Sequence, residues 1–166
     1  MPQLLDVHET LTPSDEKTHR RYSFAVPANC QALEFHLRYT PRFLSEEESV
    51  AQAEASLVDQ QATLAEIVGE PVASRWAANV RPLAAGLRIS NMLTISLDDS
   101  DGEYRGAAHR QSDDQRLMLR PEAASPGLVA GALPVGTWWL TLSAHKLLSS
   151  QCAVSIQIGA EIASSD

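Results

Sequence analysis

Cysteine is scarce in this sequence: Cys30 and Cys152 are the two among 166 residues. Two thiols are too few for a disulfide framework, and these lie too far apart in the chain for a zinc knuckle. We expect free, buried thiols of a cytoplasmic protein. Both cysteines flank predicted strands, so a bridge between neighbouring strands is the alternative.

Long apolar runs and an excess of positive charge are also lacking. No stretch approaches the roughly 18 apolar residues of a membrane span. Residues 1–9 do not read as a secretory signal, because no basic segment precedes an apolar run. Thirteen basic against twenty-one acidic side chains give a formal net charge of −8. Nucleic acids and anionic membranes bind positive surfaces, so the composition predicts a cytoplasmic protein that binds neither.

Common signatures of catalysis are missing as well. The five histidines form no His-x-His pair. The sequence has no glycine-rich phosphate loop and no nucleophile elbow that would suggest a Ser-His-Asp triad. We therefore expect no enzyme activity and no obligatory cofactor.

What the sequence does contain is a series of short alternating segments. The clearest covers residues 31–39, where Leu33, Phe35 and Leu37 face one way and polar residues face the other. This period of two is typical of an antiparallel strand with one buried face. Similar strands are predicted at residues 21–26, 93–97, 115–120, 137–144 and 153–158. With the turn signals between them, they predict an all-β fold: an antiparallel β-sandwich or jelly roll of seven or eight strands.

One segment interrupts this β pattern. Residues 45–48 form a capping box, apolar residues then recur at helical spacing, and Gly69 and Pro71 are stop signals. The pattern predicts one inserted amphipathic helix over about 45–69, whose apolar stripe packs on the sandwich or on a partner chain. The predicted organisation is an extended arm at 1–20, a sandwich at 21–160 that carries the helix and an irregular connection at 71–90, and a tail at 161–166.

A compact cationic group is the first candidate binding site. Arg105, His109 and Arg110 lie close in sequence, and His145 is expected nearby. Arginine can hold a carboxylate or phosphate with two hydrogen bonds, so the group suggests a pocket for an anion or a sugar phosphate. In the alternative, the arginines form structural salt bridges with the acidic loop 98–101 or hold loop carbonyls.

Two further features point to ligands. Trp138 and Trp139 are adjacent on a predicted strand, so one faces the core and the other faces outward. The outward ring could stack on a sugar, or lie under the helix. A second interpretation concerns four acidic residues that offer oxygen ligands for Ca²⁺, although Asx-rich turns are common between strands. These residues are Asp98, Asp99, Asp101 and Glu103.

A set of short motifs resembles a known family. The motifs are Leu97-Asp98, Gly102, Arg105-Gly106, His109-Arg110, Pro126-Gly127, Gly131, Gly136-Thr137-Trp138 and His145. Together they resemble the N-terminal β-sandwich, an accessory domain, of PHP-type metal-dependent phosphoesterases. The resemblance covers about residues 20–160 and is weaker in the helical insert.

The resemblance implies an accessory module without the hydrolase. The catalytic PHP domain is a barrel whose His-x-His pairs and carboxylates hold metals, and this chain has neither those pairs nor the length for a barrel. We expect a non-catalytic module that acts in protein interaction or assembly, with a protein partner or a second copy of itself. The alternative is a small-ligand module for a carbohydrate or a phosphorylated metabolite. A concave pocket joining the candidate residues would favour a ligand, and a flat apolar patch would favour assembly.

Overall fold

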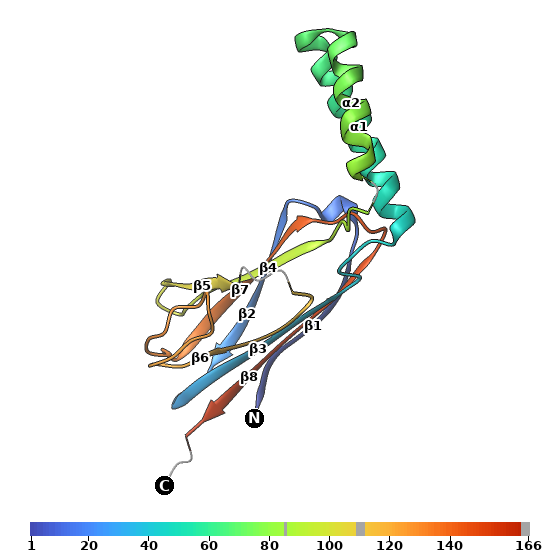
Figure 1. Ribbon diagram of the computed structural model, residues 1–166. Coiled ribbons are helices and arrows are strands. Elements are labelled where there is room, and N and C mark those ends of the chain that lie inside the picture. The colour runs from blue at the N-terminus through green and yellow to red at the C-terminus, as the bar shows by residue number, and fades with distance from the viewer. Residues whose placement is uncertain (85, 109–111, 164–166) are drawn as a thin grey trace. The chain divides into compact units, whose positions relative to one another are not determined.

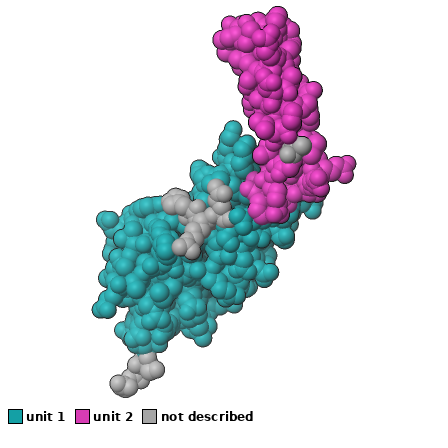
Figure 2. All heavy atoms as spheres, in the orientation of Figure 1, with its two compact units in different colours: residues 1–42, 91–166 teal, residues 43–90 magenta. Residues whose placement is uncertain are grey.

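The computed structural model describes residues 1–84, 86–108 and 112–163. Within them the chain forms eight strands and two α-helices, arranged in two compact units (Figure 2). Residues 1–42 and 91–166 make up the first unit, and residues 43–90 make up the second. The strands are β1 (Gln3–Leu11), β2 (Thr18–Val26), β3 (Cys30–Thr40), β4 (Met92–Asp98), β5 (Tyr104–Ala108), β6 (Asp114–Leu119), β7 (Gly136–Lys146) and β8 (Cys152–Ile162).

The strands of the first unit form two antiparallel sheets. One sheet has the order β1-β8-β3-β6 and the other has the order β2-β7-β4-β5. Figure 1 shows β1, β8 and β3 side by side, so strands from opposite ends of the sequence are neighbours. This two-sheet architecture is consistent with the predicted β-sandwich.

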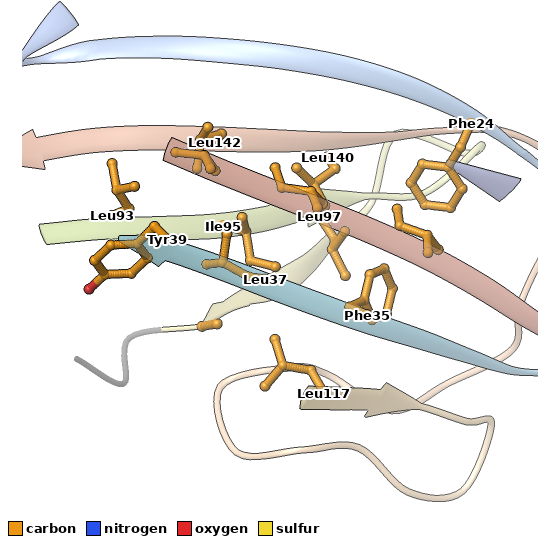
Figure 3. Close-up of a cluster of buried hydrophobic side chains, with 14 of the residues drawn as sticks. Phe24, Phe35, Leu37, Tyr39, Leu93, Ile95, Leu97, Leu117, Leu140 and Leu142 are labelled. Atoms are coloured by element: carbon orange, nitrogen blue, oxygen red, sulfur yellow. The ribbon is translucent and has the colours of Figure 1, made fainter. Parts of the chain in front are cut away.

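The core lies between the two sheets. Leu33, Phe35 and Leu37 of β3 are at most 1% exposed, as the alternation of that strand predicts. They meet the inward residues of β4 and β7, among them Ile95 and Leu140 (Figure 3). Each sheet therefore buries one face and leaves its other face for contacts outside the core.

The predicted arm over residues 1–20 is wrong, because most of it is sheet. β1 covers residues 3–11 and pairs with β8, and β2 already begins at Thr18. The alternation of β1 was obscured by Glu9, which shares the less exposed side of the strand with Val7 and Leu11. Its carboxylate forms an ion pair with Arg20 of β2. The predicted tail is also shorter than expected: residues 161 and 162 belong to β8, and residues 164–166 lie outside the described residues.

The second unit is a helical hairpin, not the single predicted helix with an irregular connection. α1 (Glu46–Val68) begins at the expected capping box: Ser45 Oγ accepts from the Glu48 N–H at 3.2 Å. α2 (Glu70–Ala84) follows after one residue, Gly69, whose φ of +88° and ψ of 151° are accessible mainly to glycine. Pro71 falls in the first turn of α2. A backbone N–H in the first turn has no acceptor within its own helix, so proline, which lacks this N–H, costs no helical hydrogen bond there. The stop signals therefore mark a reversal between two helices.

Two findings concern the apolar character of the helices and the state of the cysteines. Among the described residues, no helix is both long and apolar enough to cross a membrane. Cys30 and Cys152 are free thiols. They lie at opposite ends of the neighbouring antiparallel strands β3 and β8, because Cys30 pairs with Ile162. Ten residue steps along β8 separate the two ends by about 33 Å, so a bridge between these cysteines is excluded.

Candidate functional site

Arg105 on β5 is buried, with 5% of its surface exposed. Its guanidinium donates to the carbonyl oxygens of Val129 at 3.1 Å, Gly131 at 3.1 Å and Ala132 at 2.7 Å. Nη1 also lies 3.3 Å from Oδ2 of the buried Asp99. The side chain thus holds a loop and a carboxylate in place, which corresponds to the structural alternative considered for this arginine.

Two glycines explain the next motifs. Gly106 and Gly127 have φ of +100° and +96°, and the Ala107 N–H donates to the Gly127 carbonyl oxygen at 2.9 Å. A Cβ added to Gly106 would lie 2.2 Å from that oxygen. No side chain can occupy this space, so the Arg-Gly and Pro-Gly steps meet through their backbones.

Trp138 completes the same cluster. Its side chain is fully buried, its indole N–H donates to the Pro134 carbonyl oxygen at 2.9 Å, and the Arg105 guanidinium lies 5.1 Å from its ring centroid. The structure therefore brings together Arg105, Asp99 and Trp138 of the candidate residues. Their contacts connect β5 and β7 with the β4–β5 loop and with the loop that precedes β7.

Trp139 lies on the opposite side of β7, as expected for the neighbour of a core residue. It is half-buried, and the Arg21 guanidinium of β2 lies 4.4 Å from its ring centroid. Arg21 Nη2 is also 3.3 Å from Asp98 Oδ2. A cation–π contact within the chain therefore already covers one face of the ring that could stack on a sugar.

The remaining cationic candidates do not join Arg105. His145 is exposed and shares a hydrogen bond of 2.8 Å with Thr94 Oγ1. The residue before His145, Ala144, pairs with Leu93 of β4. The residue after Arg105, Gly106, pairs with Leu97 of the same strand. Four residues along β4 correspond to about 13 Å. His109 and Arg110 lie outside the described residues.

The acidic loop is organised by its own backbone. Asp99 Oδ1 accepts from the N–H groups of Asp101 at 3.0 Å and Glu103 at 2.9 Å. Asp98 is engaged by Arg21, and the side chains of Asp101 and Glu103 are exposed. Across residues 1–84, 86–108 and 112–163, no group of three or more His, Cys, Asp or Glu is placed to hold a metal ion. The loop thus has the contacts of the Asx-rich turn that was the alternative to a Ca²⁺ site.

The helical hairpin carries an apolar surface that the sequence reasoning missed. A hollow of about 400 Å³ is lined by Gln60, Thr63, Leu64, Ile67 and Trp76. Ile67 is 75% exposed. On α2, Trp76 and Leu83 follow Val72 by four and eleven residues, so all three share one side of the helix. Val72 and Leu83 are both exposed. We define the hairpin apolar face as Leu64, Ile67, Val72, Trp76 and Leu83.

The opposite seam of the hairpin is polar. Gln61 Nε2 donates to Glu70 Oε1 at 3.2 Å and to Ser74 Oγ at 3.3 Å. Farther along, Arg81 Nε lies 3.4 Å from Glu54 Oε2. One side of the hairpin is therefore closed by hydrogen bonds while the other presents hydrocarbon. Helical spacing of the apolar residues in α2 was the available signal, but the two prolines in that segment hid it.

Few large side chains stabilise this hairpin from within. Its fully packed apolar residues are Ala53 and Leu57 of α1 with Ala73 and Ala77 of α2. Three of these are alanines, which bury little surface on folding. The hairpin thus places most of its larger apolar side chains at its surface.

Comparison with known proteins adds no identity to this picture: the sequence matches no family model and no curated protein.

Proposed function

We propose that this chain is a non-catalytic β-sandwich module that acts in assembly, pairing with a second copy of itself through the hairpin apolar face. One observation carries the proposal: Ile67, Val72 and Leu83 expose 75%, 54% and 70% of their surface on one side of a two-helix hairpin. Burial of such a surface is the usual driving force for association.

The proposed fold is a jelly roll of the kind that the quoted motifs resemble in PHP-type phosphoesterases. Its support is the strand order. Every connection between consecutive strands except β4–β5 passes from one sheet to the other, and all strand neighbours are antiparallel. This is the crossing pattern of paired Greek keys. The shared motifs would then preserve the Arg105 cluster as a structural unit of such sandwiches.

The proposal that the module is non-catalytic rests on how its polar groups are used. Arg105 and Asp99 bind each other and the backbone. Two imidazole–hydroxyl pairs lie on β2, β4 and β7, His19 with Ser143 and His145 with Thr94. In the described part of the chain, neither imidazole is hydrogen-bonded to a carboxylate, the third group that would orient a catalytic base.

Charge favours a second copy as the occupant of the hairpin apolar face. α1 carries six acidic residues and no basic one, whereas α2 carries two arginines and one glutamate. A two-fold axis parallel to the helices places each α1 over the α2 of the other copy. This arrangement puts Glu66 of one copy near Arg75 of the partner subunit, because both residues lie within about 9 Å of the hairpin tip. The interface is then self-complementary, as a two-fold interface must be.

The size of this face sets the strength of the expected dimer. α2 is about 22 Å long, and two packed helices are about 20 Å wide. Pairing two such faces buries roughly 900 Å² in total, which is below the roughly 1,200–2,000 Å² of stable specific interfaces and in the range of weak, transient ones. We therefore expect reversible dimers with a dissociation constant in the micromolar range or weaker.

Sedimentation velocity of the full chain over a series of concentrations tests the proposal. We expect a monomer–dimer equilibrium that Ile67→Glu abolishes. Val58→Glu is the matched control: Val58 is 61% exposed on the same helix, but nine residues at 100° each place it on the opposite side of α1. A monomer at every concentration, or equal effects of the two variants, would overturn the proposal.

A charge exchange distinguishes a second copy from a different protein partner. Glu66→Arg should weaken the dimer by repulsion from Arg75 of the partner subunit, and Arg75→Glu should do the same. The double variant should restore association, because it recreates the pair with reversed signs. If the double variant loses as much association free energy as the two single variants added together, the two copies do not pack in this way.

A further inference from the structure

The outer face of the β1-β8-β3-β6 sheet is hollowed along its second strand. Side chains on this face of β8 are small at Ala153, Ser155 and Gly159, whereas those of the flanking strands are longer. Two hollows result, of about 600 Å³ and 460 Å³. We call this surface the β8 trough. Met1 lies across one end, 3.3 Å from where a Cβ of Gly159 would stand.

Strand register arranges eight polar side chains in two rows across the trough. The first row is Asp6, Gln157, His36 and Arg116, each paired with the next across neighbouring strands. In the same sense, the second row is His8, Ser155, Arg38 and Asp114. Strands lie about 4.8 Å apart, so each row spans about 15 Å. These dimensions match a ligand of one or two hexose units.

Contacts within the rows fix several groups and leave others available. Asp114 Oδ1 lies 2.8 Å from His36 Nε2, and its Oδ2 lies 3.6 Å from Arg38 Nε. On the other side of the trough, Asp6 Oδ1 lies 3.0 Å from His8 Nε2. The two carboxylates therefore hold the imidazoles and one arginine in defined positions.

The floor and one wall of the trough keep unused hydrogen-bonding capacity. Within the described residues, the Ser155 hydroxyl and the Arg116 guanidinium have no hydrogen-bond or ion-pair partner. Gln157 donates to Asp6 at 3.4 Å, which leaves its carbonyl oxygen as an acceptor. Donors and acceptors thus lie near one another in the β8 trough.

We propose that the β8 trough binds a neutral polyhydroxylated ligand of the sugar class. Each hydroxyl of a sugar donates one hydrogen bond and accepts others, so a diol suits a surface that presents carboxylate, amide and guanidinium groups together. The two rows contain two carboxylates and two arginines, which balance in charge.

Other ligand classes fit less well. An anion would meet the carboxylate of Asp114, which lies beside Arg38 and two residues before Arg116 on β6, and an apolar ligand would find polar side chains on both walls. The aromatic residues nearest the hollows, Phe35 and Tyr39, are buried in the core at 1% and 4% exposure. Recognition therefore depends on hydrogen bonds without ring stacking, and we expect weak, saturable binding.

Amide NMR titrations with maltose, cellobiose and inorganic phosphate test this inference. They are best made on the Ile67→Glu chain, so that the result is independent of dimer formation. We expect saturable shifts confined to residues 6–8, 36–38 and 155–157 with at least one disaccharide, and none with phosphate. Shifts with phosphate alone, or no shifts at these positions with either disaccharide, would overturn the proposal.

Two variants locate the effect in the trough. Ser155→Tyr fills the floor and should abolish the shifts, while Arg116→Gln, at an exposed position, should weaken binding several-fold without affecting folding. Ser96→Tyr is the matched control, since Ser96 is a half-buried outward serine on a middle strand of the other sheet. Shifts that survive both Ser155→Tyr and Arg116→Gln would show that the ligand binds elsewhere.

Discussion

Replacing Arg105 with methionine removes a buried guanidinium while keeping a side chain of similar length. In the folded protein this group contacts Asp99 and three loop carbonyls, and both ionic side chains are only 6% exposed. Loss of one member of such a pair leaves the other charge buried without compensation. We therefore expect Arg105→Met to destabilise the sandwich strongly.

The size of the effect follows from the number of partners. Breaking a buried pair costs about 3–5 kcal/mol, and a carbonyl left without a donor costs about 1–3 kcal/mol when water cannot reach it. These terms overlap, because the loop relaxes toward solvent once the arginine is gone. A total of about 3–5 kcal/mol corresponds to a decrease in melting temperature of roughly 10 °C for a chain of this size.

Urea unfolding followed by tryptophan fluorescence measures this change. Both the parent and the variant should carry Trp76→Phe, so that the signal comes from Trp138 and Trp139 in the sandwich. Arg21→Met is the control, because Arg21 makes an exposed pair with Asp98 and stacks on Trp139. Its loss should cost about 1 kcal/mol or less.

Equal free-energy losses for Arg105→Met and Arg21→Met would refute this reasoning. Such a result would mean that the cage around Arg105 contributes little to stability.

Three further predictions concern the hairpin and the titratable groups. Gly69→Ala should cost about 1–3 kcal/mol, because its φ and ψ exclude a Cβ; circular dichroism should show the helices melting earlier, and an unchanged melt would contradict this. Burial raises the pKa of the Cys152 thiol to about 11 and that of Cys30 to a lesser extent. Maleimide at neutral pH should therefore label Cys30 first and Cys152 only on unfolding. The hydrogen bond from His36 lowers the pKa of Asp114 from its ordinary value of 3.8. The stability that this interaction contributes is therefore complete above pH 3.8 and is lost as the pH falls through the lowered pKa of Asp114. ¹³C titration of the His36→Gln variant should show the pKa of the Asp114 carboxyl rising again.

The strands that the sequence predicted best are those with uninterrupted alternation. β3 is such a case: its inward positions are all apolar, so the period of two identifies both the strand and its buried face. β1 was missed because one inward position is Glu9, whose charge is neutralised by Arg20 on another strand. A local pattern cannot reveal a partner that only the fold brings near.

The helical region shows a similar limit. Gly69 and Pro71 end a helix in most sequences, and they do end α1, but glycine also permits the backbone to reverse within one residue and proline is tolerated in the next first turn. The same residues are therefore compatible with a stop or with a hairpin. Packing between the two helices decides between them.

Candidate sites were the least predictable part. The sequence singles out Arg105 and Trp138 as candidates, but the proximity of Arg105 to three carbonyls and to Asp99 depends on a loop that returns to β5. The β8 trough depends on register between β1, β8 and β3, which no local pattern specifies. Small residues on one face of a strand form a hollow only where the side chains of the adjacent strands are longer. The sequence alone does not show which strands are adjacent.

The position of β8 between β1 and β3 also sets an order in time. As the chain leaves the ribosome, β2, β7, β4 and β5 can complete their sheet once residue 146 has emerged, while β1 and β3 still lack the strand that joins them. Their unpaired edges close only when residues 152–162 are available. The trough on that sheet is therefore the last surface of the sandwich to form, and a chain that has not finished folding cannot yet bind there.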